Sequence, residues 1–420
     1  MTQADLLIIN AAEVVTCAGF SDAPARGPDQ QVVRIVRDGA VAVSEGRILA
    51  VGASDRLRRE HRVPEEAVLD AAGGVVLPGF VDSHTHLVFA GDRSIEWEQR
   101  MQGKPYLDIL REGGGIQSTV KKTRAAAIGA LHTNALRWAT TCMEHGTTTL
   151  EAKSGYCLDH DGELKLLEVA RAVQSELPIR IVSTFLGAHV VPPEFSKNRA
   201  GYLELLEGLM AEIRKRELAE FVDVFCEREA FTLAETERLL RHALGLGFEL
   251  KLHAEQFTAS GAAALGAELG ARSVDHLEHV DDASIAKLAA APRPPVGVLL
   301  PGVPFHLAMP EHAPARKLID AGVPVAIATD LNPGSSFTAS IPMCIALACR
   351  TLGMTASEAV VATTINAAHA IGRGHEIGSI EPGKRADLIV CDVPDHRWLG
   401  YAFGMNPVRS VVVAGERIYD

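Results

Sequence analysis

The sequence predicts an α/β protein: a (β/α)8 TIM barrel with a small β-sandwich domain that the N- and C-terminal segments form together. Three observations lead to this prediction. The centre of the chain alternates apolar strands with longer amphipathic segments, both ends show strand-and-turn patterning, and 420 residues suffice for one barrel and a smaller unit. The expected boundaries are 1–77 and 378–420 for the two parts of the β-domain and 78–377 for the barrel.

The N-terminal part is predicted to consist of short strands and turns. Apolar runs at 6–10 and 41–52 favour strands, and Glu45-Gly46-Arg47 inside the second run is a hairpin signal. Residues 21–31 are rich in Pro, Gly, Asp and Gln, which predicts a surface loop.

The barrel is predicted from repeated strand and helix patterns. Eight apolar segments are the expected strands: 80–86, 147–153, 179–189, 221–227, 248–255, 273–279, 296–302 and 323–330. Helix-like segments between them include 129–145, 162–176, 202–217, 233–245 and 262–270. Strands separated by crossover helices pair in parallel, and eight such units close into a barrel.

The C-terminal part returns to strand patterning after a last helix-like region at 356–371. The segments 378–392 and 410–420 contain too few strands to be stable alone, so we expect them to pair with the N-terminal strands.

Composition excludes several classes of function. A net charge of -12 argues against a nucleic-acid partner, because phosphate contacts require clustered Lys and Arg. The N-terminus lacks a basic export signal, and no stretch approaches 18 apolar residues, so no membrane association is expected. The 7 cysteines include no C-x-x-C pair, which is typical of reduced thiols in a cytoplasmic protein. A small molecule is therefore the expected partner.

Metal-compatible side chains gather at the predicted carboxyl ends of the strands, where barrel active sites lie. His84 and His86 end the first strand, and a period of two places both on one face. An H-x-H pair alone is a weak signal, but His253 ends the fifth strand, His276 lies in the sixth and Asp330 ends the eighth. Imidazole and carboxylate ligands suit Zn²⁺, Fe or Mn and leave a position for water.

These residues lie in motifs that resemble the metal-dependent amidohydrolase superfamily over nearly the whole chain. The motifs are PGFVDSHTH (78–86), KLHAE (251–255), VDHLEH (274–279), ATDLNPGS (328–335) and GSIEPGKRADLIV (378–390). The resemblance implies His84, His86, His253 and Asp330 as metal ligands, and a catalytic role for His276 rather than His279. Dinuclear members carry a lysine at the end of the fourth strand, where this chain has Phe225-Cys226-Glu227, so one Zn²⁺ or Fe³⁺ per subunit is expected.

Within the superfamily, the chain is similar to the imidazolonepropionase family. The matching segments are FAGDRSIEW (89–97), REGGGI (111–116), EAKSGY (151–156), FLGAHVVPPE (185–194), FVDVFCE (221–227), LHAEQF (252–257) and TDLNPGSS (329–336). The resemblance implies hydrolysis of 4-imidazolone-5-propanoate to N-formimidoyl-L-glutamate in histidine degradation, by a protein that forms a homodimer. Where some members carry a glutamate, this chain has Gln256, which favours a hydrogen bond to the substrate ring over a general base.

The expected catalytic groups are His276, Asp330 and Gln256. Asp330 is placed to accept a proton from a metal-bound water and His276 to stabilise the developing oxyanion; which of the two moves the proton stays open. Arg93 is the expected clamp for the propanoate group. The other expected substrate contacts are Tyr106, Tyr156, His189, Gln256, Asn332, Gly334 and Ser335.

Two other functions are compatible with part of this pattern. One is another cyclic-amide hydrolase or a heterocycle deaminase of the same superfamily, although a neutral base has no use for a carboxylate clamp. The other is a catalytically inactive scaffold, which would be expected to have lost metal ligands that this chain retains.

Overall fold

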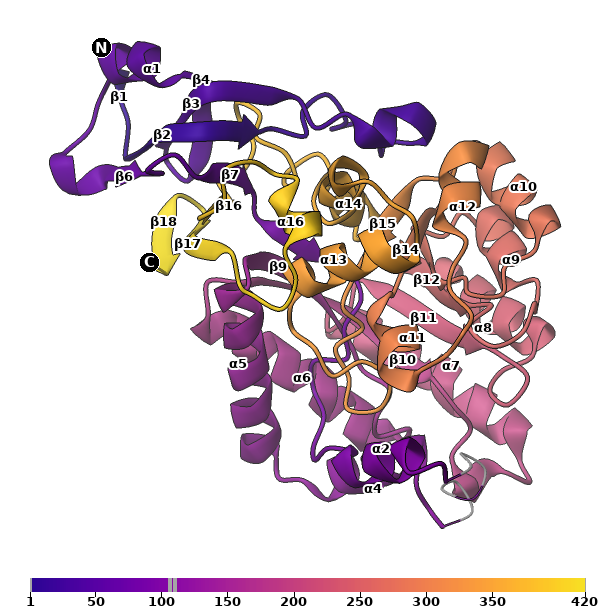
Figure 1. Ribbon diagram of the computed structural model, residues 1–420. Helices are drawn as coiled ribbons and strands as arrows, with labels where there is room; N and C mark the ends of the chain where they lie inside the picture. The colour runs from indigo at the N-terminus through magenta and orange to yellow at the C-terminus, as the bar shows by residue number, and fades with distance from the viewer. Residues whose placement is uncertain (1, 105–107, 109–111, 420) are drawn as a thin grey trace.

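The computed structural model describes residues 2–104, 108 and 112–419 and has two parts, a barrel and a sheet that the two ends of the chain build together (Figure 1). Eight parallel strands form the barrel sheet and pair in chain order from β8 to β15. They are β8 (Phe80–Asp82), β9 (Thr147–Lys153), β10 (Arg180–Ala188), β11 (Phe221–Cys226), β12 (Glu249–Ala254), β13 (Ser273–His276), β14 (Val296–Leu299) and β15 (Val325–Ile327). The predicted barrel is confirmed.

Helices cover the outside of the barrel. They are α2 (Ser94–Met101), α4 (Ile116–Ala125), α5 (Ile128–Glu144), α6 (His160–Glu176), α7 (Arg199–Lys215), α8 (Leu233–Gly245), α9 (Ala262–Leu269), α10 (Asp282–Ala290), α11 (Gly302–Leu307), α12 (Ala315–Ala321), α13 (Ile341–Thr351), α14 (Ala356–Ala362) and α15 (Ile365–Ala370). Side chains fix where several begin: Asp159 caps α6, and Thr232 forms a capping box with Glu235 at α8. The single helix expected at 356–371 is wrong, because the backbone of Thr364 leaves helical geometry and separates α14 from α15.

The second part is a mixed sheet of strands from both termini, in the order β18-β17-β16-β7-β2-β3-β4, with β6 beside β2. Its strands are β2 (Leu6–Val15), β3 (Ile35–Ser44), β4 (Arg47–Ala53), β6 (Val68–Asp70), β7 (Val75–Pro78), β16 (Leu388–Cys391), β17 (Val408–Val413) and β18 (Glu416–Tyr419). The pair β1 (Thr2–Gln3) and β5 (His61–Arg62) and the helices α1 (Ser54–Glu60) and α16 (Trp398–Tyr401) complete it. Because β7 pairs with β16, the predicted joining of the two ends is confirmed (Figure 1).

Two predictions about this part need correction. Residues 21–31 are not simply a surface loop, because Gln30 is fully buried and exchanges hydrogen bonds with Val325 N and O, at 3.0 and 3.1 Å. Residues 378–387 are not strand: the buried Lys384 donates to Gly374 O at 2.6 Å and holds this segment in turns. Gln30 thereby fastens the N-terminal part of the chain to β15, at the base of the barrel.

Apolar side chains fill the space between strands and helices. Fully buried residues such as Phe185 and Tyr202 pack between the barrel wall and its helices, Phe221 packs with Val81 and Val298 in a separate cluster, and Ile8, Val76 and Leu388 pack within the terminal sheet. No helix among the described residues is long and apolar enough to cross a membrane.

Candidate metal centre

The barrel closes at its carboxyl end, where the first and last strands lead into the candidate site. The chain past Asp82 leaves β8 and bonds to the segment after β15: Asp330 N donates to His84 O and His86 N to Leu331 O, both at 3.0 Å. The strand expected at 80–86 ends at Asp82. Beyond it, Thr85 O still accepts from Lys153 N at 2.9 Å on the β9 side, while residues 84 and 86 bond to the segment after β15. These backbone bonds place His84, His86 and Asp330 side by side.

Four imidazole rings and one carboxylate meet at this closure. The ring centroid of His84 lies 5.5 Å from that of His86, 4.6 Å from that of His253 and 5.5 Å from that of His276. Ligand atoms of His84, His86 and His253 lie within 4.8 Å of one another, as do those of His84, His276 and Asp330. The structure thus brings the five predicted residues together, and His279 lies outside both groups.

The cluster has the properties expected of a metal site. His84 Nε2, His253 Nε2 and Asp330 Oδ1 are buried and have no hydrogen-bond partner among the described residues. The closest contact of Asp330 Oδ1 with either His84 Nε2 or His86 Nε2 is 3.4 Å, in a geometry that forms no hydrogen bond. Unpaired buried polar atoms are costly. A divalent or trivalent ion among them would satisfy all three.

Two aspartates behind the cluster fix the orientation of two of its rings. Asp275 Oδ2 lies 2.6 Å from His84 Nδ1, and Asp223 Oδ2 lies 2.9 Å from His253 Nδ1. A carboxylate only accepts hydrogen bonds, so each Nδ1 carries a proton and each Nε2 is the nitrogen left to bind a metal. Sequence reasoning missed both residues. The nearby Asp82 accepts from the backbone N–H and the hydroxyl of Thr329 and holds the segment that follows β15.

Protonation of the cluster follows from burial and from these carboxylates. Burial holds the pKa of His253 well below its ordinary value, so its ring is neutral. Burial and Lys153 would lower the pKa of His84, but Asp275 and Asp330 raise it to about 9, so a bound metal would replace a proton on this ring. Burial would raise the pKa of Asp330, but contacts with His84 and His86 outweigh this effect and keep that pKa well below its usual range.

His276 enters the cluster through an unusual backbone. Its φ is 83° and that of Leu277 is 69°, a conformation that costs energy for residues other than glycine. The strain turns the ring of His276 to 5.2 Å from that of His253, and its buried Nδ1 has no hydrogen-bond partner among the described residues.

The turn after β15 shapes the wall beside Asp330, whose own φ is 51°. Asn332 Oδ1 accepts from the backbone N–H of both Gly334 and Ser335 at 2.8 Å, while its Nδ2 donates to Asp330 O at 2.7 Å. Ser335 Oγ lies 3.3 Å from Asp330 Oδ2. The side chain of Asn332 is therefore occupied within the turn.

Aromatic rings line the opposite side. His189 stacks on His86 with centroids 5.3 Å apart and an interplanar angle of 17°, and Tyr156 lies 5.3 Å from His86. Burial, followed by the neighbouring His86, lowers the pKa of His189 to about 3, so its ring is neutral. Gln256 is buried in the turn that follows β12.

Arg93 and the surface around it complete this end of the barrel. Its Nε donates to Glu96 Oε2 at 2.9 Å, and its Nη1 packs so closely on Gly334 that a Cβ there would collide with it. Together with Trp97, His306 and Phe337, it lines a pocket of about 420 Å³. Tyr106, another predicted contact, lies outside the described residues.

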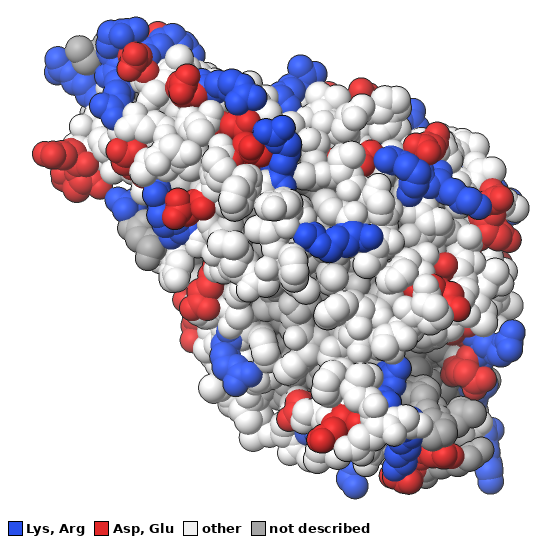
Figure 2. Space-filling view, viewed as in Figure 1, with Lys and Arg blue, Asp and Glu red and all other residues white. Residues whose placement is uncertain are grey.

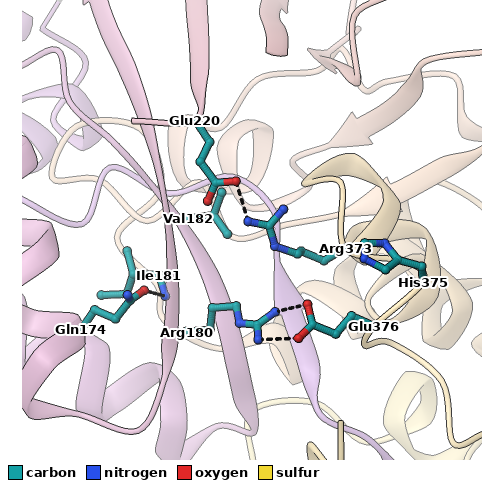
Figure 3. A pocket seen from close by; sticks show the side chains of 8 residues that line it. All are labelled: Gln174, Arg180, Ile181, Val182, Glu220, Arg373, His375 and Glu376. Atoms are coloured by element: carbon teal, nitrogen blue, oxygen red, sulfur yellow. Dashed lines mark hydrogen bonds and ion pairs between the residues drawn. The ribbon is translucent and has the colours of Figure 1, made fainter. Parts of the chain in front are cut away.

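A second pocket, of about 380 Å³, lies at the opposite end of the barrel, where β10 and β11 begin (Figure 3). Its arginines are paired with acids: Arg180 makes two hydrogen bonds to Glu376, and Arg373 bonds to Glu220. Barrel active sites lie at the carboxyl ends of strands, so this pocket is not the catalytic one.

Comparison with known proteins identifies the family. The model of the amidohydrolase family matches residues 75–418, and that of an imidazolonepropionase-like composite domain of bacteria matches residues 39–62. An imidazolonepropionase of Geobacillus thermodenitrificans is 46% identical and covers 99% of this chain and 98% of its own length. An imidazolonepropionase of Parabacteroides distasonis is 45% identical, and the match covers 99% of this chain and 99% of that protein. The chain belongs to the imidazolonepropionase family of amidohydrolases.

Solved structures with a similar fold include other amidohydrolase-like enzymes. An adenosine deaminase from Xanthomonas campestris with bound zinc has a TM-score of 0.70 at 22% identity, covering 99% of this chain and 93% of that one. A 5-methylcytosine deaminase from Klebsiella pneumoniae has a TM-score of 0.72 at 16% identity, covering 98% and 97%. These likenesses show the fold alone. Membership of the imidazolonepropionase family makes the chain a hydrolase of C–N bonds, with a cluster that could hold the metal on which amidohydrolases depend.

Proposed function

We propose that this chain hydrolyses 4-imidazolone-5-propanoate to N-formimidoyl-L-glutamate, the imidazolonepropionase reaction of histidine degradation. Water adds to the ring carbonyl carbon, the ring C–N bond breaks, and the released nitrogen takes a proton. The observation that carries the proposal is the buried cluster whose ligand atoms lack partners, in a chain 46% identical to a named imidazolonepropionase over its length.

The proposed ligands of the metal are His84, His86, His253 and Asp330. Nitrogen and carboxylate donors suit one Zn²⁺ or Fe³⁺ per subunit. When bound, the metal supplies Lewis acidity that makes hydroxide available from water near neutral pH.

Asp330 and His276 are the proposed proton-handling and charge-stabilising groups. Asp330 is ionised, and its Oδ1 is free of hydrogen bonds from the described residues, so it can accept a proton from the attacking water and deliver it to the departing ring nitrogen. His276, whose ring lies 5.2 Å from that of His253, can donate to the carbonyl oxygen as negative charge develops there. Gln256 can hydrogen-bond the ring.

The remaining contacts would orient the substrate. Arg93 is proposed to bind the propanoate group, because a guanidinium pairs with a carboxylate in a bidentate geometry. Tyr156 and the neutral His189 present two aromatic rings beside His86, against which a planar five-membered ring can pack. Tyr106, Asn332, Gly334 and Ser335 are proposed to complete the pocket around the ring and the chain.

The test is turnover by purified protein of known metal content. Incubation with 4-imidazolone-5-propanoate should give N-formimidoyl-L-glutamate well above the spontaneous background, and a chelator or His253→Ala should abolish it. His160→Ala is the matched control, because His160 is exposed on α6 and should leave the rate unchanged. A metal-loaded protein that does not turn the substrate over would refute the proposal, and deamination of neutral heterocycles would be tested next.

A homodimer is proposed for the same protein. The C-terminal segment around α16 exposes Trp398, Tyr401, Phe403 and Met405, with Tyr401 73% and Phe403 67% accessible. Figure 2 shows few charged side chains on the face over α13 and α16, which suits contact with a second copy. Sedimentation should give twice the chain mass, and Tyr401→Lys with Phe403→Lys should give the monomer; a wild-type monomer would refute the proposal.

A further inference from the structure

Five charged side chains are fully buried inside the barrel beneath the candidate metal centre. They are Glu151 and Lys153 on β9, Asp223 on β11, Lys251 on β12 and Asp275 on β13. Buried ion pairs repay their desolvation poorly, and apolar side chains of similar volume often pack there with equal stability. The layer therefore calls for an explanation beyond stability.

Lys153 stands at the centre of this layer. Its Nζ donates to Asp223 Oδ2 at 2.7 Å and to Glu151 Oε1 at 2.8 Å, and lies 3.5 Å from Asp275 Oδ2. These two Oδ2 atoms are the ones that contact the ring nitrogens of the proposed ligands, Nδ1 of His253 and Nδ1 of His84. One ammonium group thus contacts both carboxylates that orient the cluster.

We propose that Lys153 is a positioning residue for the metal centre: through Asp223 and Asp275 it fixes the ring orientations of His253 and His84 together. The inference rests on the metal site of the proposed function. Lys153 touches neither substrate nor reacting atoms, so it acts through the two aspartates. Its donated hydrogen bond prevents Asp223 from rotating away from His253, and its charge holds Asp275 close to the same point.

Lys251 offers a matched comparison within the same layer. It is equally buried, but its Nζ donates to the backbone carbonyl of Ser83 at 3.0 Å. Its nearest carboxylate oxygens, on Glu151 and Asp275, lie at 3.6 and 3.8 Å, beyond hydrogen-bond distance. Removing Lys251 takes away one buried positive charge while leaving the hydrogen bond from Lys153 to Asp223 in place.

The experiment compares zinc binding by the full-length wild-type protein, Lys153→Met and Lys251→Met, using a competing chromophoric chelator. Lys153→Met should raise the Kd for zinc about 10- to 100-fold, the range found when outer partners of metal ligands are removed. Lys251→Met, which removes no hydrogen bond from either Asp223 or Asp275, should raise it less than Lys153→Met does. The visible spectrum of the Co²⁺-loaded proteins gives a second readout, because it reports ligand geometry: it should shift for Lys153→Met and match the wild type for Lys251→Met.

The outcomes separate this inference from the proposed function. A wild-type protein that binds no zinc, or whose binding survives His253→Ala, overturns the metal site and the inference with it. Normal zinc binding by the wild type, with the Kd and Co²⁺ spectrum unchanged in Lys153→Met, overturns the inference alone, as does an equal loss in Lys251→Met. Should Lys153→Met fail to fold, Lys153→Gln, which keeps an N–H donor without the charge, decides by the same measurements.

Discussion

Asp223 holds His253 at two points: its Oδ2 accepts from the ring Nδ1 at 2.9 Å, and its Oδ1 accepts from the backbone N–H at 3.1 Å. The backbone N–H can only donate, so this side chain must present an acceptor there. The other oxygen then selects the tautomer of His253 in which Nε2 has a free lone pair. A single aspartate thereby fixes both the position and the proton of a proposed metal ligand.

Asp223→Asn should therefore weaken metal binding although it changes one atom. Oδ1 of Asp223 accepts from the backbone N–H of His253, and Oδ2 accepts from both His253 Nδ1 and Lys153 Nζ. An amide in either orientation therefore sets an NH₂ group against a donor, which loosens the hold on the ring of His253 and on its tautomer. We expect the Kd for zinc to rise about 10- to 100-fold or more, as measured by competition with a chelator.

Asp387→Asn is the control for that substitution. Asp387 is also buried, but it accepts from Ala414 N in the terminal sheet, away from the cluster. The Asp387→Asn variant should bind zinc with the same Kd as the wild type. Equal losses in the two variants would show that a general effect on folding, rather than the tautomer of His253, controls the metal.

The sequence was sufficient to predict the barrel and the cluster because both depend on position along strands. His84, His86, His253, His276 and Asp330 are polar residues at the ends of apolar segments, and parallel strands bring such ends to one rim. The strands that lead into the site, such as those predicted at 80–86 and 323–330, are shorter in the structure. The sequence pattern of an extended segment is the same whether its backbone pairs with a neighbouring strand or with a turn.

The residues that sequence reasoning missed lie inside strands rather than at their ends. Asp223 stands between two valines and Asp275 between Val274 and His276, and a charged residue in such a strand is also compatible with a solvated face. The available signal was the polar alternation of Glu151 with Lys153 and of Lys251 with His253, which marks an inward face with period two. Which charge meets which depends on the barrel's register and is not contained in any one strand.

Gln30 makes another contact between segments far apart in the sequence, and removing its side chain should destabilise the protein. Its side chain accepts from Val325 N and donates to Val325 O, as a neighbouring strand would for β15. In Gln30→Ala the N–H of Val325 loses its partner, whereas Val325 O keeps the hydrogen bond that Asn366 Nδ2 donates at 2.9 Å. One unpaired buried group costs about 1–3 kcal/mol, so we expect a loss of that size on urea unfolding.

Gln31→Ala is the control for Gln30→Ala. It removes the same amide group, but from an exposed side chain. Its unfolding free energy should stay within about 0.5 kcal/mol of the wild type. A similarly small effect of Gln30→Ala would mean that β15 does not depend on this contact.

Gly334→Ala should raise the KM for the substrate while sparing kcat. A Cβ at this position would collide with Nη1 of Arg93 and displace the guanidinium proposed to bind the propanoate group. The contact between Arg93 and the propanoate group is made equally in the bound substrate and in the transition state. Losing such a contact raises KM alone, here by about tenfold. Steady-state kinetics will distinguish this from a fall in kcat, which would place the damage at Asp330 instead. Gly245→Ala, at the end of α8 where a Cβ meets nothing within 4 Å, should leave both constants unchanged.

The ion pair of Glu376 with Arg180 should stabilise the protein at neutral pH and lose that effect in acid. Arg180 donates to Glu376 at 2.7 and 2.8 Å and lowers the pKa of this carboxyl from 4.5 to about 2. A lowered folded-state pKa means that the stabilisation is complete above pH 4.5 and is lost as the pH falls toward 2. Glu376→Gln should therefore cost about 1 kcal/mol of unfolding free energy at pH 7, since the pair is partly solvated.

The measurement is urea unfolding of chelator-treated protein at pH 7, 5 and 4. The difference in unfolding free energy between Glu376→Gln and the wild type should shrink only below pH 4.5. Glu416→Gln, at an exposed position on β18, is the control and should differ little from the wild type at each pH. A difference that grows in acid would contradict this pairing, because protonation can only weaken an ion pair.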